Sequence, residues 1–102
     1  MPLEVIALEF NFDAAILCFQ KYGVNKAAVF GSVARQEDRE SSDIDLIVSF
    51  SKKYDLLELV GLKQDLEDAL QRPIDIITYN ALKNDSFASN VLSEAKIIYE
   101  QN

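Results

Sequence analysis

The chain has 102 residues, 49% of them hydrophobic, and we expect one small globular domain over residues 1–102. Its net charge of −7 argues against direct nucleic-acid binding, which gains affinity by neutralising phosphates, and against an anionic membrane surface. With one cysteine and no histidine, it has no intrachain disulfide, hardly any structural zinc ligands and no histidine-based triad. The N-terminus lacks a signal peptide's basic start, and no apolar run approaches the about 20 residues of a membrane span, so we expect a cytoplasmic protein.

Apolar spacing and turn residues predict alternating helices and strands. In chain order we expect a helix from Asn11 that stops at Gly23, strand 24–30, a short helix 33–38, strand 43–50, helix 56–70, strand 74–78, a helix through Ala95 capped by Asp85 or Ser86, and a short strand 97–99. This order predicts an α+β domain with one small mixed sheet backed by helices.

The helix over 56–70 carries a long leucine stripe. Its members are Leu56, Leu59, Leu62, Leu66 and Leu70, with Leu57 and Val60 widening it. We expect this stripe to belong to the core rather than to an interface.

Three carboxylates fall where strands are expected, although aspartate is depleted in strands. Alternation places Asp43 and Asp45 on one face, about 6.6 Å apart along the strand. Asp75 faces the same place if its strand is their neighbour. Taken alone, each of these residues is more often an exposed strand residue.

The three charges together would be costly. Two carboxylates about 6 Å apart repel by roughly 3 kcal/mol at an effective dielectric near 20. Three such pairs reach about 8 kcal/mol, which is comparable with the stability of a whole domain. Such a cluster requires a proton or a cation, and oxygen ligands without His or Cys select Mg²⁺ or Mn²⁺. Two such ions are the usual device for displacement at phosphorus.

Gly31 and Ser32 stand between an expected strand and an expected helix. Glycine lets the backbone approach a ligand closely, and the N–H groups of a helix start together with a serine hydroxyl suit phosphate oxygens. Arg35 is a nearby cation that could contact a polyphosphate. An ordinary capped turn would look the same, so the motif gains meaning only in combination.

The combination resembles a known family. Gly31-Ser32, ten intervening residues and then Asp43-Ile44-Asp45, with Asp75 on a later strand, is similar to the signature of the polymerase-beta-type nucleotidyltransferase superfamily. The stretches 30–35, 42–48, 73–78 and 91–99 resemble its minimal branch, the MntA-like proteins. One departure is Gln36, where the family commonly has glycine.

The resemblance implies a nucleotidyltransferase fold and a reaction. A nucleoside triphosphate, expected to be ATP, would bind with Mg²⁺, most simply two ions, and Mn²⁺ is an alternative. An acceptor hydroxyl would attack the α-phosphorus, and pyrophosphate would leave. Asp43, Asp45 and Asp75 would be the metal-binding and catalytic residues, and Gly31, Ser32 and Arg35 would bind the nucleotide.

The resemblance also implies a partner. Relatives that modify antibiotics, tRNA or DNA carry added substrate domains, whereas this chain is short, so we expect it to borrow a surface from a partner. In the minimal branch the partner is a HEPN-domain toxin, which suggests an antitoxin that transfers AMP to a tyrosine of that toxin. Two alternatives stay open: an antitoxin that neutralises its partner by binding alone, and a nucleotidyltransferase acting on a small molecule.

Overall fold

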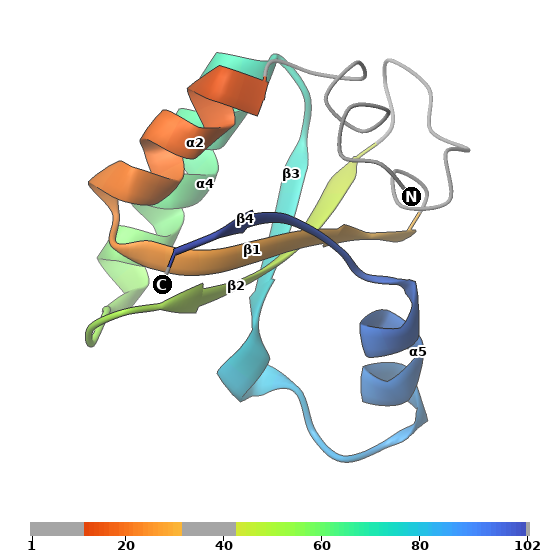
Figure 1. Cartoon of the computed structure of the whole chain (residues 1–102). Coiled ribbons are helices and arrows are strands. Elements are labelled where there is room, and N and C mark those ends of the chain that lie inside the picture. The colour runs from red at the N-terminus through yellow and green to blue at the C-terminus, as the bar shows by residue number, and fades with distance from the viewer. Residues whose placement is uncertain (1–11, 32–42, 102) are drawn as a thin grey trace.

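The computed structural model describes residues 12–31 and 43–101 (Figure 1). The elements are α2 (Phe12–Lys21), β1 (Val24–Phe30), β2 (Ile44–Phe50), α4 (Leu56–Leu70), β3 (Ile74–Thr78), a 3-10 helix η1 (Tyr79–Ala81), α5 (Ser86–Glu94) and β4 (Lys96–Glu100). In these two ranges, no helix is long and apolar enough to cross a membrane.

The strands form one mixed sheet in the order β3-β2-β1-β4. β1 runs antiparallel to both β2 and β4, whereas β2 and β3 are parallel. α2 and α4 lie side by side on one face of the sheet, and α5 lies apart from them, beside the other face (Figure 1). The expected α+β class, with a small mixed sheet backed by helices, is confirmed.

The alternation of side chains along β2 divides the core in two. Ile44, Leu46 and Val48 are buried in the larger cluster, which α2 and α4 cover. Ile47 points to the other face, where it packs with Ala28 of β1 and with Val91 of α5. The odd-numbered positions of β2 therefore face the side of the sheet on which α5 lies.

α4 is the crossover that parallel pairing of β2 and β3 requires. Its C-terminal half is anchored in the core by Leu62, Leu66 and Leu70. Its last turn is followed by Gln71 in the left-handed conformation, with φ of 56°. The carboxylate of Glu67 then accepts a hydrogen bond of 3.0 Å from the backbone N–H of Ile74, the first residue of β3. The end of α4 thus holds the start of β3 in place.

A polar cluster joins α2 to α4. Asp65 accepts hydrogen bonds from Nζ of Lys21 at 2.9 Å and from the hydroxyl of Tyr22 at 2.8 Å. Lys21 first, and Tyr22 second, lower the pKa of Asp65, and the same carboxylate raises the pKa of both donors. Gly61 makes room for this contact, because a Cβ there would stand 2.9 Å from the Tyr22 hydroxyl oxygen.

The prediction that helix 56–70 buries its whole stripe was wrong at the N-terminal end. Leu56 and Leu57 are 73% and 80% exposed, and Val60 is 55% exposed. The helical rotation of about 100° per residue explains this, because five residues turn Leu57 about 140° away from Leu62. The apolar surface of α4 is therefore wider than the strip that the sheet and α2 cover.

Other differences are small. The expected strand 97–99 extends from Lys96 to Glu100, strand 43–50 begins at Ile44, and η1 was not anticipated. Asp85 rather than Ser86 caps α5, since its side chain accepts from the backbone N–H of Ala88. The expected helix 33–38 lies outside the described residues.

The Asp65 cluster makes stability depend on pH at both ends. Because folding lowers the pKa of Asp65, its carboxylate contributes fully to folding stability above its usual pKa. This contribution is lost as the pH falls through the pKa that Asp65 has in the folded protein. Because folding raises the pKa values of Lys21 and Tyr22, the two residues contribute fully to folding stability below their usual pKa values. This contribution is lost as the pH rises through the pKa values that they have in the folded protein. We expect Asp65→Asn to lower the urea midpoint most near neutral pH, with the difference from wild type shrinking at both pH extremes.

Urea denaturation followed by circular dichroism across the pH range checks this. The control is Asp68→Asn, where the amide oxygen still accepts the exposed hydrogen bond from Gln64. An Asp65→Asn variant whose deficit stays constant down to strongly acid pH would contradict the assignment.

Candidate functional site

Asp43, Asp45 and Asp75 lie at one end of the sheet, where the parallel strands β2 and β3 begin. Asp43 directly precedes β2 and is exposed, Asp45 is half-buried in β2, and Asp75 is exposed in β3. All three belong to the described residues.

The strand register brings Asp45 and Asp75 together. The two residues are direct partners in the parallel ladder, as are Ile44 and Ile74 one position earlier. Ile44 and Ile74 are buried toward α2 and α4, so alternation turns the carboxylates to the opposite face. Neighbouring strands lie about 4.8 Å apart, so the two aspartates stand side by side. The sequence predicted that Asp75 would face the same place as Asp45 if their strands were neighbours, and β2 and β3 are neighbours.

The backbone of Gly31 packs directly against the carboxylate of Asp45. Phe30, the last residue of β1, pairs with Asp45 across the antiparallel ladder. Gly31 follows with φ of +68°, and a Cβ at this position would stand 3.4 Å from Cγ of Asp45 and collide with its Oδ2. Only glycine meets both requirements, the left-handed backbone and the close approach. Gly31 therefore belongs to the carboxylate site.

Two predicted nucleotide-binding residues, Ser32 and Arg35, lie outside the described residues, as does Gln36. Their roles stay a prediction. Of the three predicted nucleotide-binding residues, the structure describes only Gly31.

The donor set fits a hard divalent cation, because carboxylate oxygens are the ligands that Mg²⁺ and Mn²⁺ prefer. Over residues 12–31 and 43–101, however, no three acidic or other metal-ligating side chains gather closely enough to form a ready site. The register brings Asp45 and Asp75 together at one end of the sheet, and their role as metal ligands stays a prediction.

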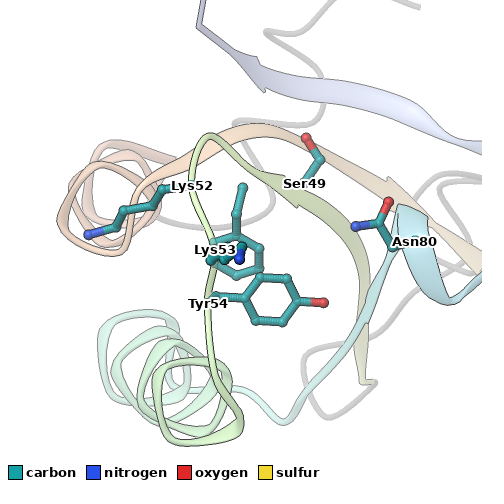
Figure 2. Close-up of a pocket in the computed structure, with 6 residues that line it drawn as sticks. Ser49, Lys52, Lys53, Tyr54 and Asn80 are labelled. Carbon is teal, nitrogen blue, oxygen red and sulfur yellow. The ribbon is translucent and has the colours of Figure 1, made fainter.

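A cavity of about 590 Å³ lies at the other end of β2 (Figure 2). Its lining residues are Ser49, Phe50, Lys52, Lys53, Tyr54 and Asn80. The rings of Phe50 and Tyr54 stack with centroids 4.2 Å apart, and Lys52 points away from Tyr54. Both lysines are exposed. This cavity is separate from the carboxylates.

A second cavity borders Asp75 itself. It has a volume of about 400 Å³ and is lined by Leu59, Val60, Lys63, Asp75, Ile76 and Ile77. Sequence reasoning missed it, because the apolar residues of α4 were assigned to the core. The sequence feature that could have indicated this cavity is the widening of the leucine stripe by Leu57 and Val60.

Two curated relatives are similar over most of the chain. A Methanocaldococcus jannaschii protein named "Putative protein adenylyltransferase MJ0435" is 44% identical over 75 residues, covering 74% of this chain and 80% of the relative. The protein adenylyltransferase MntA of Thermococcus cleftensis is 36% identical over 75 residues, covering 74% of this chain and 75% of the relative.

Solved structures share the fold. One described as a "putative minimal nucleotidyltransferase" is 36% identical with a TM-score of 0.74, covering 94% of this chain and 95% of that one. The structure of a tri-AMPylated Shewanella oneidensis HEPN toxin in complex with MNT antitoxin matches with a TM-score of 0.69 at 18% identity, over 94% of this chain and 73% of that one.

The family model described as "Polymerase beta, Nucleotidyltransferase" matches residues 15–102, a range that includes Gly31 and all three site aspartates. The resemblance inferred from the Gly-Ser and D-x-D spacing is thereby confirmed. The chain belongs to the polymerase beta nucleotidyltransferase family, in its minimal, MntA-like branch.

Proposed function

We propose that this protein is a Mg²⁺-dependent protein adenylyltransferase that transfers AMP from ATP to a tyrosine hydroxyl of a HEPN-type toxin and thereby neutralises it. The observation that carries the proposal is the pairing of Asp45 with Asp75, beside Asp43 and against the backbone of Gly31. The names of the relatives point to protein as the acceptor, and the Shewanella complex points to a HEPN partner. The reaction belongs in the cytoplasm, where ATP is available.

The roles follow from the positions of the carboxylates. Asp43 and Asp45, two residues apart at the start of β2, would hold Mg²⁺, most simply two ions. The metal would neutralise charge on the triphosphate and polarise the α-phosphate. Gly31 would let the phosphates approach the backbone, with Ser32 and Arg35 as further contacts.

Asp75 has a different position, because it stands on the edge strand β3. From there its carboxylate would accept the proton of the acceptor hydroxyl as the oxygen attacks the α-phosphorus. The new bond joins the tyrosine oxygen to the α-phosphorus, the bond between the α-phosphorus and the oxygen that bridges to the β-phosphorus breaks, and pyrophosphate leaves with its electron pair. Positioning and electrostatic stabilisation carry such a transfer, so it needs no histidine.

We expect Asp45→Asn to lower the rate of AMP transfer by more than about 100-fold, because loss of even an outer-shell partner of a metal ligand costs about 10–100-fold. The measurement is transfer of label from α-labelled ATP, with Mg²⁺, to a HEPN-domain protein from the same genome. The control is Asp68→Asn, which changes an exposed carboxylate on α4 and should keep full activity.

The same experiment separates the alternatives. A toxin that is neutralised equally well by Asp45→Asn and wild type, without label, would replace the enzyme with an antitoxin that acts by binding alone. Label that appears on a small molecule but not on protein would contradict the protein acceptor.

We expect Gly31→Ala to abolish most of the transfer, because its Cβ would displace the Asp45 carboxylate. The left-handed backbone adds a strain of about 1–2 kcal/mol. Gly23→Ala is the matched control: Gly23 has φ of +74°, but its Cβ would meet only the Lys52 and Ser51 side chains, first Cε of Lys52 at 3.2 Å. Both variants should lose similar stability in thermal melts, whereas only Gly31→Ala should lose activity. Equal activity of the two variants would show that Gly31 has no role in the site.

A further inference from the structure

The N-terminal half of α4 carries an apolar patch formed by Leu56, Leu57 and Val60. Their side chains are 73%, 80% and 55% exposed. They follow each other over little more than one helical turn, so they form one patch rather than scattered single residues. Contiguous exposed apolar side chains of this kind mark interaction sites more often than single ones do.

The apolar patch continues into the cavity that borders Asp75. Val60 belongs to both, and with Leu59 it forms the helix side of a groove whose other side is the edge strand β3, at Asp75, Ile76 and Ile77. Asp75 in turn is the ladder partner of Asp45. The lining of this cavity therefore joins the exposed side chains of α4 to Asp75 on the edge strand of the sheet.

We propose that this surface, from Leu57 and Val60 to Asp75, binds the acceptor protein and directs its hydroxyl to the catalytic carboxylates. This inference rests on the proposed function and extends it, because it assigns a separate binding surface to the acceptor protein. The groove is apolar on most of its wall and has one cation, Lys63, so it suits side chains of a protein better than a triphosphate. Its volume of about 400 Å³ admits a few apolar side chains, not a whole element.

Charge specifies the occupant further. Asp55 and Glu58 flank the patch at the start of α4, Asp75 is one of the residues that line the groove, and the whole chain has a net charge of −7. Complementary charge favours a basic partner and speeds its encounter. The occupant is therefore a basic segment of the acceptor protein with exposed apolar side chains, and the apolar face of a helix fits the patch on α4.

The test compares acceptor binding and acceptor modification in surface variants. We expect Leu57→Glu and Val60→Glu each to raise both the Kd and the KM for the HEPN-domain protein at least tenfold. The Kd for ATP, the melting temperature and kcat at saturating acceptor should stay at their wild-type values. Leu57→Ser should show the same defect more weakly, without added charge. Leu17→Glu is the matched control, since Leu17 is 67% exposed on α2 and the variant carries the same new charge.

The outcomes distinguish this inference from the proposed function. Wild-type Kd and KM in Leu57→Glu and Val60→Glu would overturn the docking surface and leave the proposed function standing. A wild-type protein that binds the acceptor without transferring AMP would overturn the proposed function. In that case the Kd values of the variants would still show whether Leu57 and Val60 belong to the surface that binds the acceptor. If Leu57→Glu instead dissociates a dimer of this chain in sedimentation experiments and acceptor binding stays intact, the patch joins two copies and the inference is overturned.

Discussion

The parallel, in-register pairing of β2 with β3 is the constraint on which the site depends. It makes Asp45 and Asp75 direct neighbours on one face, with Ile44 and Ile74 buried on the other. A slip of one residue would turn Asp75 into the core and an isoleucine into the site. Such a slip would bury a carboxylate and expose an isoleucine, and the free-energy cost of both changes favours the observed register.

That register is maintained by α4. Leu62, Leu66 and Leu70 fix the helix over the sheet, and the left-handed turn at Gln71 directs the chain into β3. Glu67 then binds the first backbone N–H of the strand. The same helix exposes Leu56, Leu57 and Val60 at its other end. In our proposal, the C-terminal half of α4 thus positions Asp75, the proposed catalytic carboxylate, and its N-terminal half binds the acceptor protein.

Much of the fold could be predicted from the sequence, because periodicity and turn residues report on local structure. The combination of Gly31-Ser32, the D-x-D motif and Asp75 indicated the family through its resemblance to the nucleotidyltransferase signature, although each feature alone would not have done so. The parallel register could not be derived, since it depends on long-range packing of α4. The exposure of Leu56, which was expected in the core, could not be derived either. Apolar spacing shows that a helix has an apolar face, but a core and a docking surface present the same pattern. Ser32 and Arg35 stay predictions made from their motif.

We propose that the carboxylate end of the sheet, rather than the cavity lined by Lys52, Lys53 and Tyr54, binds the metal–nucleotide complex. A crystal structure with Mg²⁺ and a non-hydrolysable ATP analogue tests this most directly. We expect the triphosphate beside Gly31, with metal bound by Asp43 and Asp45 and with Asp75 next to Asp45. A nucleotide bound at the Lys52–Tyr54 cavity, or metal bound without these aspartates, would contradict it.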